Sequence, residues 1–158
     1  MPRTSPIPTE SLDYFMGCDP GTSGSIMILH RSGKIHSEIR WDWTLAEIGS
    51  AIRKARKHIC FALVEQVGAM PTDARSSAFK FGNAFGCMRG MISVCGIRHE
   101  YIRPQDWQGK MSCRSKGNKN ITKARAQQLF PDYKITHRNA DALLLAELAR
   151  RTALERGW

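Results

Sequence analysis

The stretches YFMGCD (14–19) and FALVE (61–65) decide the fold, because each is an apolar run that ends on a carboxylate. Runs of about four to eight apolar residues are typical of the buried central strands of an α/β sheet. A charged side chain at the edge of such a strand loses hydration unless a cation or several hydrogen bonds compensate. A third acid, Asp141, opens the apolar run 142–146, and His137 precedes it by four residues. The three acids and the histidine are therefore candidates for one metal site.

Length and charge limit the kinds of protein to consider. The chain has 158 residues, Lys and Arg number 24 against 14 Asp and Glu, and the net charge is +10. We expect one domain over 13–158 with a substantial core, preceded by a disordered, polar lead-in over 1–12. The basic balance favours a polyanionic partner, with nucleic acid ahead of an acidic membrane surface. No apolar stretch approaches the roughly 18 residues of a membrane span, and the lead-in lacks the apolar core of a secretory signal.

The cysteines indicate a reducing compartment. The chain has five, an odd number, and no two are closely spaced. Zinc sites use paired short spacings, so a zinc site is not expected. We predict reduced thiols and a cytoplasmic-type location, with an organelle as the alternative. Cys113, in a polar basic stretch, is the one thiol expected to be exposed.

The first half of the chain predicts an antiparallel three-strand meander followed by a helix and a buried strand. The third strand alternates apolar and polar residues, as an exposed sheet edge does. Thr44 precedes a basic helix as an N-cap residue. The expected strands are 14–19, 25–30, 34–41 and 60–65, and the expected helix is 44–58.

The second half predicts a long helix over 73–95 with a continuous apolar stripe. Gly82, Gly86 and Gly90 recur in it at four-residue spacing, and each costs about 1 kcal/mol relative to alanine in a helix interior. Close approach of another backbone offsets that cost, from either the protein's own sheet or a second subunit. The remaining expected elements are a strand over 99–102, a mobile loop over 112–120, and helices over 121–130 and 137–156.

This order of elements, together with three short motifs, resembles the RuvC-type Holliday-junction resolvases of the ribonuclease H-like superfamily. The motifs are GCDPGT (17–22), VEQV (64–67) with AFKFG (78–82), and ADALL (140–144). The segment RPQDW (103–107) with Lys110 is similar to the phage and plastid branch. The resemblance implies a three-layer α/β/α fold on a five-stranded mixed sheet, in which two parallel strands join the meander.

The chemistry of the acids agrees with that resemblance. In-line hydrolysis of a phosphodiester requires stabilisation of the attacking water and the leaving oxygen, which two magnesium ions about 4 Å apart provide. Such hard cations take oxygen ligands and retain waters, so three or four side chains suffice. We predict two Mg²⁺ per site, with Mn²⁺ able to substitute. Asp19 is expected to bridge both ions, with Glu65 on one and Asp141 on the other.

His137 and Lys110 are the two members of this site with an alternative interpretation. The bacterial resolvases carry two acids three residues apart on the last helix, but Arg138 holds the earlier place here. His137 lies one residue further back, four before Asp141, so both share a helix face and His137 is expected to ligate metal or orient the water. The alternative is an ordinary histidine at a helix start. Lys110 is expected to neutralise the phosphate as charge builds, or is a solvated surface lysine.

DNA contacts are expected from basic residues around the site, which would give salt-dependent affinity. By analogy with the family, Met70 and Pro71 form a wedge at a junction. The expected DNA-binding residues are Arg75, Lys80, Arg103, Lys110, Arg114, Lys116, Lys119 and Lys123.

These features predict a magnesium-dependent endonuclease that resolves four-way DNA junctions by paired symmetric nicks. Two nicks require two sites, so a twofold homodimer is expected, with no membrane partner and no small-molecule cofactor. Alternatives are a ribonuclease H-type or other structure-specific nuclease of the same fold, and a non-catalytic nucleic-acid-binding module. The run DPGT (19–22) also resembles the phosphate loop of actin-like sugar kinases, but those need two such domains.

Overall fold

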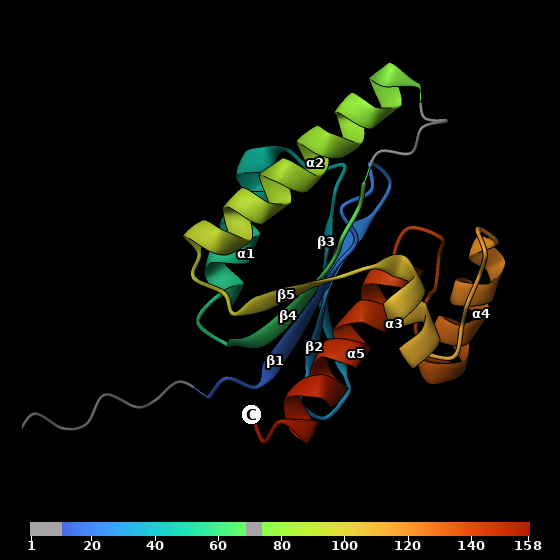
Figure 1. Ribbon diagram of the computed structural model, residues 1–158. Coiled ribbons are helices and arrows are strands. Elements are labelled where there is room, and N and C mark those ends of the chain that lie inside the picture. The colour runs from blue at the N-terminus through green and yellow to red at the C-terminus, as the bar shows by residue number, and fades with distance from the viewer. Residues whose placement is uncertain (1–10, 69–73) are drawn as a thin grey trace, which may run out of the picture.

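A five-stranded mixed sheet forms the centre of the protein, as described for residues 11–68 and 74–158 of a computed structural model (Figure 1). The strand order is β3-β2-β1-β4-β5. β1 pairs antiparallel with β2, and β2 with β3, whereas β1–β4 and β4–β5 are parallel. The predicted meander with two added parallel strands is confirmed. The strands are β1 Tyr14–Cys18, β2 Ser25–His30, β3 Ile35–Arg40, β4 Ile59–Glu65 and β5 His99–Ile102.

Helices cover both faces of this sheet, which confirms the predicted three layers. One face carries α1 (Leu45–Ala55) and α2 (Arg75–Val94). The other carries α3 (Pro104–Lys110), α4 (Lys119–Leu129) and α5 (Ala140–Glu155), with α5 lying directly along the strands (Figure 1). Within the described ranges, no helix is both long and apolar enough to cross a membrane.

Strand alternation aims the two strand-end acids at the α5 face of the sheet. Phe15, Phe61 and Leu63 belong to the core on that face. Their neighbours on the same strands, Met16 and Ala62, belong to the core under α1 and α2. Because successive side chains point to opposite faces, the positions two residues beyond Gly17 and Leu63 return to the α5 side. Those positions are Asp19 and Glu65.

Gly17 lets α5 lie almost on the backbone of β1. A Cβ atom built on Gly17 would collide with the backbone of Ala142 and Ala146. Only glycine permits this approach at a central strand. The first turn of α5, which carries Asp141, is thereby held beside the end of β1.

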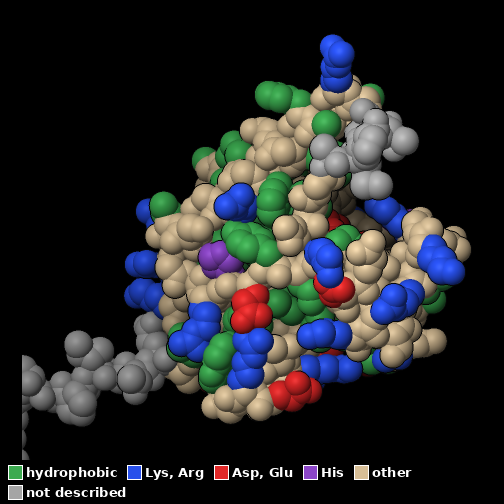
Figure 2. Space-filling model, viewed as in Figure 1, with side chains coloured by type: hydrophobic (Ala, Val, Ile, Leu, Met, Phe, Trp, Pro, Cys, Tyr) green, Lys and Arg blue, Asp and Glu red, His purple; other side chains and the backbone are tan. Residues whose placement is uncertain are grey.

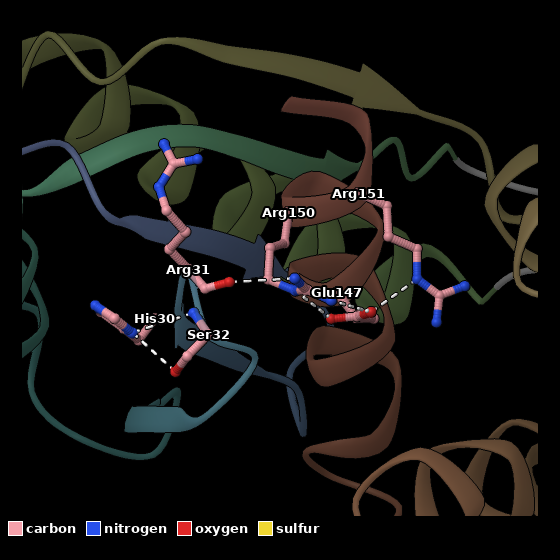
Figure 3. A network of polar contacts seen from close by, with 6 residues as sticks. All are labelled: His30, Arg31, Ser32, Glu147, Arg150 and Arg151. Atoms are coloured by element: carbon pink, nitrogen blue, oxygen red, sulfur yellow. Dashed lines mark hydrogen bonds and ion pairs between the residues drawn. The ribbon is translucent and has the colours of Figure 1, made fainter. Parts of the chain in front are cut away.

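An ionic network fixes the other end of α5 (Figure 3). The buried carboxylate of Glu147 accepts hydrogen bonds from Arg150 Nε at 2.8 Å and Arg151 Nε at 2.7 Å. Arg150 Nη1 also donates to the carbonyl oxygen of Arg31, in the turn between β2 and β3, at 3.2 Å. Both ends of α5 are therefore tied to the meander.

One prediction about the basic segment 112–120 is wrong. Cys113 is buried rather than exposed. The expected loop is present over 113–118, and Gln108 Oε1 accepts hydrogen bonds within it from Ser115 N at 3.0 Å and Ser115 Oγ at 3.2 Å. The polar composition of the segment hid these contacts, which come from α3, a short helix that the sequence pattern did not reveal. α4 accordingly begins at Lys119, two residues earlier than expected.

The two long helices also differ from their predictions. α5 begins at Ala140, and His137 lies in the preceding turn instead of in the helix. The apolar stripe predicted for α2 is confirmed only in its C-terminal half, where Met88 and Ile92 are buried and Phe85 and Cys95 pack against the core, whereas Phe81 is exposed. The N-terminal half of α2 extends past the edge of the sheet (Figure 1), so its apolar residues meet no core there.

Candidate metal centre

Asp19, Glu65 and Asp141 meet at one edge of the sheet. β1 and β4 are parallel neighbours with Cys18 opposite Val64, so the residues that follow, Asp19 and Glu65, emerge side by side. Asp141 lies in the first turn of α5, which packs against β1 at Gly17. The structure thus brings together three acids that are 46 and 76 residues apart in sequence (65 − 19 and 141 − 65).

Asp19 is fixed by the turn that follows it. Its backbone N–H donates to Ser25 O at 3.0 Å, which continues the β1–β2 ladder. Its Oδ1 accepts from the backbone N–H of Gly21 at 3.0 Å. A Cβ on Gly24 would collide with the backbone oxygen of Asp19, so glycine is required at this point of the turn. The DPGT turn therefore holds the Asp19 carboxylate in place.

Glu65 is buried, with 9% of its surface exposed, and depends on a tryptophan. Trp107 Nε1 donates to Glu65 Oε1 at 2.8 Å, and the Trp107 side chain is fully buried. A buried indole N–H needs an acceptor, so Trp107 and Glu65 satisfy each other. The sequence motif RPQDW was singled out only by resemblance, and this role of Trp107 was missed.

Burial raises the pKa values of all three acids, and repulsion by a neighbouring carboxylate adds to the rise for Asp19 and Glu65. Burial, followed by the charge of Asp19, raises the pKa of Glu65 to about 8. Burial, with the charge of Asp141, raises the pKa of Asp19 to about 6, although the Gly21 hydrogen bond opposes this. Burial likewise raises the pKa of Asp141. Carboxylates this close together favour a shared proton or a bound cation.

The residues present fit a hard divalent cation. Asp141 Oδ1 is buried and accepts no hydrogen bond from the described residues. A buried carboxylate oxygen without a donor is costly, and a metal ion satisfies it directly. The three side chains offer only oxygen ligands, as Mg²⁺ and Mn²⁺ require. Within residues 11–68 and 74–158, however, no three His, Cys, Asp or Glu side chains are close enough to hold a metal as they stand.

His137 and Lys110 are placed differently from each other. His137 is exposed in the turn before α5, and its charge lowers the pKa of Asp141, which puts it near the acids. Lys110 is not brought to the acids. It ends α3 and lines a hollow with Glu100 and Arg156, along the C-terminal half of α5. The expected contact of Lys110 with the reacting phosphate is therefore not supported by its position.

Lys119 is the lysine that faces the acids. It is the first residue of α4, and its charge lowers the pKa values of Asp19, Glu65 and Asp141 alike. Sequence reasoning grouped it with the DNA-binding residues and missed this place. The sequence pattern placed the start of α4 at residue 121, so it did not show that Lys119 is the first residue of this helix.

A basic cavity of about 610 Å³ opens beside Asp141. Arg114, Lys116 and Lys119 line it, together with Thr122, and Asp141 stands at its wall. On the face shown in Figure 2, Lys and Arg side chains gather over the side that α3 and α4 occupy. Three of the predicted DNA-binding residues are thus brought to the acids.

The other predicted DNA-binding residues are dispersed. Arg75 and Lys80 are exposed on the projecting half of α2. Arg103, before α3, is held by Asp106 at 2.8 Å, and Lys123 lies on α4. Met70 and Pro71, the predicted wedge, lie outside the described residues, as do the first ten residues of the predicted lead-in.

Comparisons with known proteins agree with this fold. A scan against protein-family models and a search of curated proteins each find no match. Among solved structures, Thermus thermophilus RuvC matches with a TM-score of 0.62 at 16% sequence identity, over 91% of this chain and 96% of that one. T. thermophilus RuvC in complex with a Holliday junction substrate matches with a TM-score of 0.62 at 15% identity, over 92% of this chain and 96% of that one. The chain has a RuvC-like fold, which confirms the ribonuclease H-like architecture predicted from its sequence.

Proposed function

We propose that this protein is a metal-dependent endonuclease that resolves four-way DNA junctions by paired nicks. The observation that carries the proposal is the convergence of Asp19, Glu65 and Asp141 against a basic cavity, with raised pKa values and an unsatisfied oxygen. A protein that only bound DNA would gain nothing from acids at the surface that meets phosphate. The RuvC-like fold, seen in RuvC bound to a Holliday junction substrate, supports the choice of DNA.

Each acid has a distinct part in the proposed reaction. Asp19, at the centre, would bridge two Mg²⁺ or Mn²⁺ ions, Glu65 would hold one and Asp141 the other. When bound, the two ions activate the attacking water and stabilise the leaving oxygen. The Trp107 N–H fixes Glu65 Oε1 and leaves its second oxygen for a ligand role. His137, exposed beside Asp141, is suited to orient the water.

The cations around the acids would hold the substrate. Lys119 faces the three carboxylates and is positioned to approach the phosphate where charge develops, the part first expected of Lys110. Arg114 and Lys116, in the same cavity, would contact neighbouring backbone phosphates. Phosphate contacts position a nucleic acid without reading its sequence, so selectivity for a branch would come from shape.

We propose that the open face of α2 joins two copies into a twofold dimer. Among the described residues, a Cβ built on Gly82, Gly86 or Gly90 meets nothing within 4 Å, so the protein's own sheet does not explain these glycines. Phe79, on the same side of the helix by its spacing, is 77% exposed. A second copy packed there would bury Phe79 and use the glycines for close backbone contact.

Other predictions remain part of this proposal. The packing of Trp107 against Glu65 gives the RPQDW segment a structural purpose, which supports kinship with the phage and plastid branch. The five free cysteines are compatible with a reducing, cytoplasmic-type compartment.

Cleavage of three labelled substrates tests the proposal. A synthetic four-way junction, a linear duplex and an RNA–DNA hybrid are incubated with the protein in Mg²⁺ or in chelator. We expect symmetric cutting of the junction alone, in Mg²⁺ alone. Asp19→Asn should abolish cutting and keep junction binding.

Three results would contradict the proposal. Equal cutting of all three substrates would indicate a nuclease without junction selectivity. Preference for the hybrid would indicate a ribonuclease H. Binding without cutting in Mg²⁺ and in Mn²⁺ would indicate a binding module.

A further inference from the structure

A second basic hollow lies at the β3 edge of the sheet, the edge opposite β5. It has a volume of about 430 Å³ and is formed between β3 and the segment that leads into α5. Three cations line it, Arg40, Lys134 and Arg138, against one carboxylate, Glu38. None of these residues belongs to the DNA-binding set predicted from the sequence.

Two of the cations share one carboxylate. Arg40 Nη2 donates to Asp42 Oδ2 at 2.6 Å, and Arg40 Nε donates to Asp42 Oδ1 at 3.1 Å. Arg138 Nη1 lies 3.0 Å from the same Oδ2. One negative charge therefore orients two guanidinium groups and leaves the trio with a net charge of +1. That 3.0 Å contact is an ion pair without hydrogen-bond geometry, so the buried Nη1 of Arg138 still lacks a hydrogen-bond acceptor among the described residues.

The backbone holds Arg138 at the edge of the sheet where the acids meet. Ser25 Oγ donates to the carbonyl oxygen of Arg138 at 3.4 Å. Ser25 pairs with Arg40 across β2 and β3, and its own carbonyl accepts the backbone N–H of Asp19. Neighbouring strands are about 4.8 Å apart, so Arg40 and Asp19 are separated by about two strand spacings. The two arginines thus flank the candidate metal centre.

The one acid in the hollow is already engaged. Glu38 Oε2 accepts hydrogen bonds from Tyr133 Oη at 3.2 Å and from Asn139 Nδ2 at 3.4 Å. These hydrogen bonds compensate part of the negative charge of Glu38. Arg40 and Arg138 share the carboxylate of Asp42, so each guanidinium keeps N–H donors that Asp42 does not occupy. A guanidinium presents five N–H donors in a planar fork, which matches a phosphate. An anion with several oxygens is the ligand that this chemistry recognises.

We propose that Arg40 and Arg138, oriented by Asp42, form a clamp for a backbone phosphate of the DNA strand next to the bond that is cut. The inference rests on the proposed function and adds a contact at the β3 edge, separate from the cavity of Arg114, Lys116 and Lys119. It also accounts for Arg138, which stands where the bacterial resolvases carry an acid. This chain uses that position to bind substrate instead of metal.

Binding measurements with single variants test the clamp. Junction affinity is measured in chelator across a salt series for wild type, Arg138→Gln, Arg40→Gln and a matched control, Arg53→Gln. Arg53 is exposed in the last turn of α1, at the far end of the sheet, and makes no ion pair with any described residue. We expect about tenfold weaker binding for each clamp variant. The slope of log K against log salt should fall by about 1, and the control should keep wild-type values.

Two further variants separate a phosphate contact from a change in folding. Arg138→Lys keeps the charge and loses the fork, so we expect a wild-type salt slope with only part of the affinity restored. Asp42→Asn releases both arginines and should weaken binding without changing the slope. A melting temperature near that of wild type in each variant verifies the fold.

Neutral methylphosphonates, placed singly at the phosphates around the cleavage position, identify the contact. At one position we expect the substitution to weaken wild-type binding and to have no further effect on Arg138→Gln. Equal losses at every position in both proteins would overturn the clamp, as would unchanged affinity and slope in Arg138→Gln. A different result would separate the clamp from the proposed function. If wild type binds duplex and junction equally, but the methylphosphonate at that one position still has no further effect on Arg138→Gln, the proposed function fails and the clamp stands.

Discussion

The two longest helices of the protein lie on opposite faces of the same sheet and are built in opposite ways. Every residue of α5 from Ala142 to Ala149 is buried, and its backbone rests on β1 at Gly17. α2 buries three residues, and nothing in the described part of the chain contacts the positions where its three glycines would carry a Cβ. Both helices contain or meet glycine where a close backbone approach is possible. Among the described residues, such an approach is made by α5 and not by α2.

This contrast shows which helix completes its packing within one copy of the chain and which helix keeps an exposed apolar surface. α5 finishes the core and delivers Asp141 to Asp19 and Glu65, so a single chain assembles the acids. α2 contributes to the core only near its C-terminal half and presents Phe79 to solvent. In our proposal, therefore, α5 serves catalysis and α2 serves assembly.

The largest expected effect is on the α5 side. Asp141→Asn should reduce junction cleavage about 1,000-fold or more, because it removes a proposed metal ligand, and such a ligand is worth several kcal/mol of transition-state stabilisation. Single-turnover cleavage in Mg²⁺ measures this. Glu155→Gln, at the exposed end of the same helix, is the control and should cut at the wild-type rate. If both variants cut equally, Asp141 is not part of the site.

Gly17→Ala should destabilise the protein by about 3 kcal/mol or more, because the added methyl meets the backbone of α5, which cannot move aside cheaply. Urea denaturation measures the loss. A variant as stable as wild type would mean that α5 does not rest on β1 as closely as described, and would remove the explanation of how Asp141 reaches Asp19.

Trp107→Phe keeps the buried ring and removes the hydrogen bond to Glu65. We expect a loss of about 1–3 kcal/mol in stability and a higher pKa for Glu65, since the Trp107 N–H favours its charged form. The pH profile of cleavage should shift to higher pH. A shift in stability alone, with an unchanged profile, would limit Trp107 to packing.

Stability in chelator should fall as pH rises from about 4 to about 8. The folded pKa values of Asp19, about 6, and Glu65, about 8, lie above the ordinary values of 3.8 and 4.5. The folded state therefore binds protons more tightly, and stability is lost as pH passes through the folded values. Mg²⁺ should reverse the loss, most at pH 8. Melting temperatures with and without Mg²⁺ measure both effects, and a profile that rises with pH in chelator would contradict the raised pKa values.

Gly86→Ala should give the smallest effect and the opposite sign to Gly17→Ala. Alanine stabilises a helix interior by about 0.5–1 kcal/mol over glycine, and the new methyl meets none of the described residues of the same chain. Sedimentation should at the same time show a weaker dimer. Higher stability together with an intact dimer would place the dimer contact elsewhere on the molecule.

Much of the fold could be predicted, because its central strands are apolar over most of their length, and such runs indicate buried strands. Continuous apolar runs gave β1, β2 and β4, and Thr44 caps α1 as expected, with Glu47 N bonded to its hydroxyl at 3.3 Å. The apolar residues of α2 misled, because periodicity marks a face without saying whether anything covers it. α3 was missed because RPQDWQGK is too short and polar to show a period.

The candidate site was predictable where a charged residue lies at the edge of the apolar core. Asp19 and Glu65 stood out because apolar strands do not end on acids without a reason. Lys119 did not stand out among 24 basic residues, since its importance depends on where α4 begins. The pairing of Arg138 with Asp42 joins residues 96 positions apart (138 − 42), which no local pattern reveals.

The electron paramagnetic resonance signal of free Mn²⁺ gives the number of bound ions by difference. This measurement at pH 8 tests most directly whether the three acids form one metal centre. We predict two ions per chain for the wild type, the same for Glu155→Gln, and a clear loss of bound ion in both Asp19→Asn and Asp141→Asn. Wild-type stoichiometry and affinity in Asp19→Asn would contradict the account, because the acid proposed to bridge both ions would then hold neither.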